Sequence, residues 1–337
     1  MTFNPYPLIR LVGSRSFAVV LIIASVVVTV IGAQTGSVNP VTPPTGGFGL
    51  PWPSQWITSP AISLVAALGV DFIAMAGIIL LDRTFHIIRG LRGSGLLFAA
   101  LYMLMQGVLP AAGHFCGGSV MVLVALASIF LLYSVYQSPD LRRVLLVFVM
   151  LGAGALVDYG FVPYILVMAV GCIQMRVMGL RAIVAILAGT LVPLWVLWNF
   201  GCVKMGDFVV PGFIDNFDLG SLRNVIPSIA ATGVVILTGC ATGLLDMLQV
   251  YARNARTRAF FGLFAVTGIM TGLLCVIDFE HISFYAPLLN LTTAFFVTLL
   301  YSFRQRNSLG AGTVAISVLT LLFGGFYIWK TIVSLML

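Results

Sequence analysis

The chain has 337 residues, of which 60% are hydrophobic and only 8% are charged, and its formal net charge is +7. A soluble surface normally needs about a quarter of its residues charged, so this composition excludes a soluble globular protein and indicates an integral membrane protein. The basic residues are dispersed in twos and threes along the sequence. Because they form no basic stripe that follows a phosphate backbone, nucleic acid is not an expected partner.

The apolar residues fall into segments, most of which are long enough to cross a bilayer as a helix of about 17 to 25 residues. In chain order these segments are residues 16–33, 60–81, 94–110, 117–136, 142–157, 160–176, 181–200, 224–247, 258–277, 283–302 and 312–331. We therefore predict an all-α fold, a polytopic transmembrane helical bundle of about 11 (10 to 11) spanning helices. It forms a single integral membrane domain over residues 1–337, without a separate soluble domain. The two short segments, 142–157 and 160–176, are also compatible with a re-entrant hairpin.

The connections between these segments alternate between Arg-rich and Arg-poor. Most of the 17 Lys and Arg residues lie in one set of connections: Arg10, Arg15, Arg83, Arg89, Arg92, Arg142, Arg143, Arg176, Arg181, Arg253, Arg256, Arg258, Arg304 and Arg306. The other set holds only Lys204, Arg223 and Lys330, but six of the 10 acids: Asp158, Asp207, Asp215, Asp218, Asp278 and Glu280. Because cytoplasmic loops retain Lys and Arg, we expect the N-terminus in the cytoplasm and the C-terminus outside.

Two long connections, residues 34–60 and 201–223, are expected outside the membrane. The first is rich in Pro and Gly and carries no charge, and its Trp residues favour an anchor in the membrane interface over a lid above a cavity. The second combines Lys204 and Arg223 with several Asp residues. This mixture suits either a bound phosphate or surface ion pairs without a function. We take Lys204 and Arg223 as candidate substrate-binding residues.

A compact acid and imidazole cluster occupies a third external connection. Asp278, Glu280 and His281 are close neighbours in the sequence, and the predicted topology places Asp158 and His114 on nearby external connections. A carboxylate beside an imidazole is the minimum for general acid–base catalysis. The candidate catalytic residues are therefore Asp158, Asp278, Glu280 and His281, with His114 as a candidate substrate-binding residue. Their spacing matches no metal-ligand motif, so no metal is expected; polar residues that merely lie outside the hydrocarbon are the alternative.

Asp71 is an ionisable residue in the middle of a predicted membrane span. Carboxyl groups at that depth are costly and usually face a cavity or a partner, so Asp71 is a candidate substrate-binding residue. The alternative is a neutral acid that is hydrogen-bonded to a neighbouring helix. Asp246 lies near the cytoplasmic end of its segment, where we expect it to reach toward Arg253 or Arg256.

Small and amide side chains are expected between the helices. Gly-xxx-Gly spacing occurs at residues 239–243 and again at 268–272, within similar stretches of sequence. This spacing favours close helix packing, although two such helices of opposite direction also suit the inverted repeat of a transporter. Gln106 and Asn290 fit either interhelical hydrogen bonds or the lining of an external vestibule.

Three short motifs occur in a characteristic order. They are DRTFH at 82–86, VDYGFVP at 157–163 and, after Arg181, GTLVPL at 189–194. The chain resembles, over about residues 60–200, an uncharacterised family of polytopic inner-membrane proteins from Bacteroidota. The resemblance implies a Gram-negative inner membrane with the acidic loops facing the periplasm. That family has no established activity to carry over to this chain.

Several functions stay open at the level of sequence. Phosphate-binding, flavin and dinucleotide motifs are absent and histidines are few, so no cofactor is expected. The favoured hypothesis is an envelope-biogenesis protein that handles a lipid-linked glycan or other polyprenyl-phosphate substrate at the outer face. Such an enzyme would be a membrane glycosyl- or lipid-transferase. The alternatives are a secondary transporter or flippase, and an accessory subunit of a membrane complex. The expected partners are membrane lipids, the polyprenyl-phosphate substrate and other membrane proteins.

Overall fold

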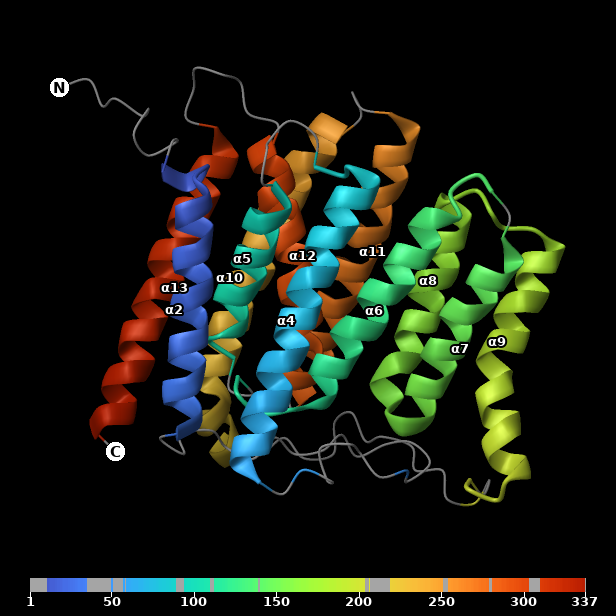
Figure 1. Ribbon diagram of the computed structural model, residues 1–337, viewed down its shortest axis with the longest axis horizontal. Helices are drawn as coiled ribbons and strands as arrows, with labels where there is room; N and C mark the ends of the chain where they lie inside the picture. The colour runs from blue at the N-terminus through green and yellow to red at the C-terminus, as the bar shows by residue number, and fades with distance from the viewer. Residues whose placement is uncertain are drawn as a thin grey trace.

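The computed structural model is a bundle of α-helices (Figure 1). It describes residues 11–34, 50, 57, 59–88, 94–109, 112–138, 140–203, 206, 219–250, 254–278, 281–302 and 310–336. The helices are α2 (Arg15–Gln34), α4 (Pro60–Phe85), α5 (Ser94–Gln106), α6 (Gly117–Ser134), α7 (Leu141–Val157), α8 (Val162–Gln174), α9 (Leu180–Asn199), α10 (Leu219–Val250), α11 (Ala255–Ile277), α12 (Ile282–Ser302) and α13 (Ala311–Met336). A 3-10 helix, η1 (Tyr159–Phe161), precedes α8. Each predicted apolar segment coincides with one of these helices, so the all-α prediction is confirmed for the described residues.

The helices have the length and the apolar surface of membrane spans. Eight are long and apolar enough to cross a bilayer, and α5 and α8 are shorter apolar helices. Many outward-facing side chains are large and apolar, among them Leu166, Leu237 and Leu321, as expected where lipid takes the place of water. The chain is therefore a multi-pass membrane protein. The number of crossings and the orientation remain predictions, as does the choice between crossings and a re-entrant hairpin for α7 and α8.

Consecutive helices run in opposite directions along the bundle (Figure 1). As a consequence, α2 begins at the end of the bundle where α4 finishes, whereas α13 finishes at the opposite end. We call the end that carries Arg83, Arg142 and Arg256 the Arg-rich end, and the end that carries Asp158 and Asp278 the Arg-poor end. The Arg-rich and the Arg-poor connections of the sequence thus lie at opposite ends of one bundle.

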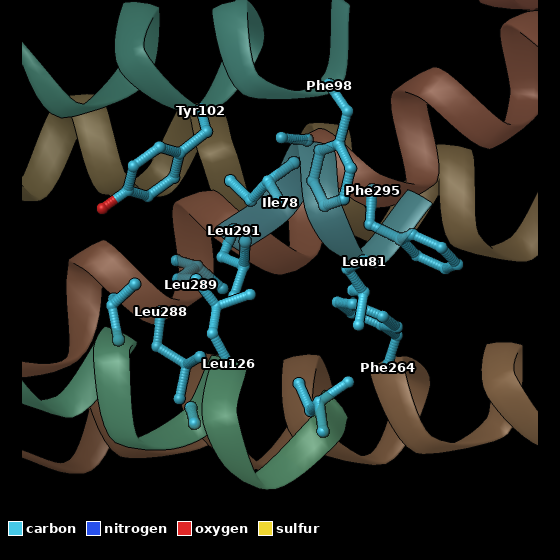
Figure 2. Packing of buried hydrophobic residues seen from close by; sticks show 14 of the residues in the cluster. Ile78, Leu81, Phe98, Tyr102, Leu126, Phe264, Leu288, Leu289, Leu291 and Phe295 are labelled. Carbon is cyan, nitrogen blue, oxygen red and sulfur yellow. The ribbon is translucent and has the colours of Figure 1, made fainter. Parts of the chain in front are cut away.

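Helix α12 is the centre of the bundle. In α12, 94% of the 18-residue apolar stretch is buried inside the protein, compared with 17% of the corresponding stretch in α9 at the periphery. It packs against α5, α6, α10, α11 and α13, and Leu288, Leu291 and Phe295 lie in the core (Figure 2). The rings of Phe264 and Phe295 stack with their centroids 3.9 Å apart. Side chains at the start of α12 are therefore held by neighbours on several sides.

The Gly-xxx-Gly stripes pack against α12, so the interpretation as close helix packing is confirmed. A Cβ atom on Gly239 of α10 would lie 2.6 Å from Oγ1 of Thr293, and one on Gly268 of α11 would lie 3.3 Å from Oγ1 of Thr292. The two Gly-xxx-Gly faces thus pack against neighbouring threonines of the same central helix. Whether they also reflect an inverted repeat remains untested.

Candidate functional site

Three of the predicted catalytic residues gather at the Arg-poor end of the bundle. Asp158 follows the last residue of α7, Asp278 follows the last residue of α11, and His281 precedes α12. Asp158 interacts electrostatically with both Asp278 and His281. Residues 120 positions apart in the sequence are therefore brought together by the packing of these helix ends.

His281 and Asp278 form a tight local pair. Nδ1 of His281 lies 2.6 Å from Oδ1 of Asp278, and the backbone N–H of His281 donates to the backbone carbonyl of Asp278. The other carboxylate oxygen, Oδ2, accepts a hydrogen bond of 3.2 Å from the hydroxyl of Tyr285. Asp278 thus fixes the imidazole through Nδ1, the arrangement that orients a histidine for proton transfer through Nε2.

Asp158 is a buried carboxyl group with one satisfied oxygen. It ends α7 and caps η1, where Oδ1 accepts a 2.7 Å hydrogen bond from the backbone N–H of Gly160. The residue is 1% exposed, and Oδ2 has no hydrogen-bond partner in the part of the chain that the structure describes. Burial raises the pKa of Asp158 from 3.8 to about 6, with a further rise from Asp278 and opposing contributions from Gly160 and His281. A carboxyl group with this pKa exchanges a proton readily near neutral pH.

Aromatic rings pack against the η1 turn that Asp158 caps. Gly160 lies so near the ring of Phe284 that a Cβ atom there would clash with it. The Phe284 ring also meets Phe161 and Tyr285 edge to face, with centroids 5.6 Å and 5.1 Å away. Phe284 of α12 therefore packs against the η1 turn that Asp158 caps. We call Phe161, Phe284 and Tyr285 the aromatic wall. It was not predicted, because the sequence indicated only the Asp-Tyr-Gly turn.

Asp71 lies apart from this cluster but is linked to it through α6. It is buried in α4, and the hydroxyl of Tyr102 on α5 donates to Oδ1 over 3.4 Å. Asp71 and Tyr102 both interact electrostatically with Cys116. The Cys116 thiol in turn lies 3.9 Å from the backbone carbonyl of Ser283, next to the aromatic wall. The interhelical hydrogen bond expected for Asp71 is present, although it is long.

Gln106 and Asn290 form an interhelical hydrogen bond. Nδ2 of Asn290 on α12 donates to Oε1 of Gln106 at the end of α5 over 3.1 Å, and both side chains are buried. The structure therefore supports the interhelical alternative for this pair over an exposed vestibule. The bond ties the central helix to α5 a short distance from Tyr102.

The remaining predicted site residues are not brought into the cluster by the described structure. His114 lies in the turn before α6, where it is half-buried and makes contacts of its own. Lys204 and Glu280 lie outside the described residues, and for Arg223 only the backbone, in α10, is described. Most of the connections at 34–60 and 201–223 also lie outside them. A phosphate-binding role for Lys204 and Arg223 therefore stays a prediction.

Asp246 does not reach toward Arg256, so this part of the prediction is wrong. Neither carboxylate oxygen of Asp246 has a hydrogen-bond partner. Arg256 instead places its guanidinium 5.3 Å from the ring centroid of Phe260 and within 6 Å of two further rings, Phe85 and Tyr136. Arg256 therefore makes cation–π contacts with a ring of α4, a ring of its own helix α11 and Tyr136 just after α6, and does not pair with Asp246. Arg253 lies outside the described residues.

The cysteines add no cross-link to the site. All of them are free: Cys116, Cys172 and Cys275 are buried, and Cys202 and Cys240 are exposed. Among the described residues there is no cluster of three or more His, Cys, Asp and Glu that could hold a metal ion. The chemistry that the Arg-poor cluster can perform with its own groups is proton transfer between His281, Asp158 and a bound molecule. The chain matches no protein-family model, no curated protein and no solved structure.

Proposed function

We propose that the chain is a bacterial inner-membrane enzyme that performs acid–base chemistry on a lipid-linked glycan or another polyprenyl-phosphate substrate at its outer face. The observation that carries this proposal is the partly buried pair of His281 and Asp278 beside Asp158, whose Oδ2 has no partner among the described residues. Structural carboxyl groups are normally satisfied on both oxygens, so an unsatisfied one beside an oriented imidazole favours a catalytic role.

The roles follow from the contacts of each group. His281, held through Nδ1, takes the proton from an attacking hydroxyl group as the general base. Asp278 stabilises the imidazolium that forms, as the carboxylate of a catalytic triad does. Asp158, whose pKa of about 6 keeps a fraction of the group protonated near neutral pH, serves as the acid through Oδ2.

A substrate carried in the membrane suits the position of the site. Asp158 lies at the Arg-poor end of α7, which packs directly against α9. Trp195 and Trp198, near the same end of α9, are exposed at the periphery, as is typical of aromatic residues at the membrane interface. A polyprenyl chain in the outer leaflet would therefore bring its phosphate and sugar to the level of Asp158.

Photo-cross-linking tests this proposal. The protein in lipid nanodiscs is irradiated with a polyprenyl phosphate that carries a photoreactive group beside its phosphate, and the labelled peptides are identified by mass spectrometry. We expect label on the peptides that contain Asp158 and His281, with competition by an unlabelled polyprenyl phosphate but not by a phosphate-free polyprenol. Label confined to the Arg-rich end, or label unaffected by competitor, contradicts the proposal.

A proton-coupled transporter or flippase is the second candidate, and the contact between Asp71 and Tyr102 favours it. Buried intramembrane carboxyl groups are common in proton relays of transporters. Under this alternative, Asp71→Asn abolishes substrate movement across a proteoliposome membrane while His281→Gln is tolerated. An accessory-subunit role predicts instead that neither substitution matters and that the chain copurifies in fixed ratio with partners.

A further inference from the structure

Asp246 is a buried carboxyl group far from the Arg-poor cluster, and the proposed chemistry does not use it. On α10, Gly239 faces Thr293 of α12, and Gly243 faces the ring of Phe296. Residues three and four positions apart share one face of a helix, so Asp246 continues this stripe toward the Arg-rich end. It is 0% exposed.

Among the described residues, no group compensates the carboxyl group of Asp246. Neither oxygen has a hydrogen-bond partner, and no ion pair of Asp246 occurs among the described residues. Thr242, one turn earlier on the same helix, donates its hydroxyl to the carbonyl of Thr238 instead. An ionised carboxylate in such surroundings loses its hydration without replacement.

Charged and titratable groups on the helices that pack against α10 are engaged elsewhere or exposed. Arg256 of α11 lies over aromatic rings, and Arg258 is exposed. On α12, Tyr301 is buried but donates no hydrogen bond to Asp246, whose oxygens have no partner. On α13, the hydroxyl of Tyr327 donates to the backbone carbonyl of Leu104. No described cation therefore balances a negative charge at Asp246.

We infer that Asp246 is a proton-binding site, in which the side chain is held as the neutral acid between α10 and α12. A larger cation needs several oxygen ligands, and the described residues contain no group of three or more His, Cys, Asp and Glu side chains that could hold a metal ion. This site is separate from the Arg-poor cluster, so its failure leaves the proposed function untouched.

Infrared spectroscopy of the protein in nanodiscs at about pH 7 tests the inference, because the carbonyl stretch of a carboxylic acid is distinct from the stretches of a carboxylate. We expect Asp246→Asn to lose one acid carbonyl band relative to the wild type. Asp82→Asn is the matched control at the same end of the bundle, because Asp82 accepts hydrogen bonds from Ile88 and Ser94. This variant should keep the acid carbonyl band that Asp246→Asn loses. Loss of carboxylate intensity alone in Asp246→Asn overturns the inference.

A labelling experiment on the wild type covers the case in which Asp246→Asn does not fold. Hydrophobic carbodiimides react with protonated carboxyl groups inside membrane proteins, whereas water-soluble ones reach only exposed groups. We expect the hydrophobic reagent to modify Asp246, as located by peptide mass spectrometry, with at least tenfold less modification by the water-soluble reagent. Equal modification by both reagents, or none at Asp246 with the hydrophobic one, overturns the inference.

Discussion

Nδ1 of His281 lies 2.6 Å from Oδ1 of Asp278, three residues earlier in the chain. Asp278 follows α11 and His281 precedes α12, and the carboxylate of Asp278 also accepts a hydrogen bond from the hydroxyl of Tyr285. Because both partners are local in sequence, the imidazole is positioned before any substrate binds. The predictions below follow from this pair, from Asp158 beside it and from the packing around them.

Removing the carboxylate of Asp278 should impair the chemistry far more than removing the hydroxyl of Tyr285. Asp278→Asn leaves the imidazolium without its stabilising charge, and an effect of about 10²- to 10⁴-fold on the transfer rate is expected. Tyr285→Phe removes one hydrogen bond, worth about 1 kcal/mol, so a loss of about tenfold or less is expected. Initial rates in proteoliposomes distinguish the two; equal losses would contradict the assigned roles.

The stability of the protein should depend on the protonation of Asp158. Its pKa is about 6 in the folded protein and 3.8 as a free side chain, so the folded state binds the proton more tightly. The resulting stabilisation is present at low pH and is lost as the pH rises from about 4 to about 6, with a total on the order of 2 to 3 kcal/mol. Thermal unfolding measured across this range should show the loss in the wild type.

Asp158→Asn is the control for this pH dependence. The amide keeps the shape of the side chain but does not titrate, so the decline between about pH 4 and pH 6 should be smaller in the variant by that same amount. An identical pH dependence in wild type and variant would show that Asp158 titrates as an ordinary exposed carboxyl group.

Gly160→Ala should destabilise the site. The added methyl group would collide with the ring of Phe284, which is held between Phe161 and Tyr285, and overpacking of this kind costs about 1 to 3 kcal/mol. Gly233→Ala in α10 is the matched control, since nothing lies within 4 Å of its Cβ position and Ala favours the helix. Comparable melting temperatures for the two variants would contradict the tight contact.

The bond between Gln106 and Asn290 predicts non-additive mutations. Asn290→Leu leaves Gln106 buried without a donor and should cost about 1 to 3 kcal/mol, as should Gln106→Leu. The double variant removes both polar groups and should recover part of that loss. Unfolding in detergent measures the coupling; strictly additive effects would mean that the two amides do not interact.

The helices could be predicted because each one is a long apolar block bounded by charges or by Gly and Pro. The predicted ends were less accurate: α5 stops at Gln106 rather than near residue 110, and at Gly107 the chain lies so close to Tyr327 and Ser25 that a Cβ atom would clash with them. Likewise α8 starts at Val162, because Asp158 caps a 3-10 turn first. Such endpoints depend on tertiary contacts, which a hydropathy pattern does not contain.

Contacts of the site between residues close in the sequence could be predicted, whereas contacts between distant segments could not. Asp278 and His281 are three residues apart, so their pairing follows from sequence alone, and the charge alternation placed Asp158 at the same end of the bundle. The aromatic wall of Phe284 over Gly160 joins distant segments and left no sequence signal. The wrong partner for Asp246 has the same origin, because two of the rings around Arg256, Phe85 and Tyr136, come from segments far away in the sequence.

The central claim is that the chain acts through the acid–base cluster at its Arg-poor end. The most direct measurement is the rate at which proteoliposomes of wild type, His281→Gln and Asp71→Asn consume a radiolabelled sugar linked to polyprenyl diphosphate. We predict turnover by the wild type, loss of at least about 10²-fold in His281→Gln, and near wild-type turnover in Asp71→Asn. Full turnover by His281→Gln together with an inactive Asp71→Asn would contradict the account.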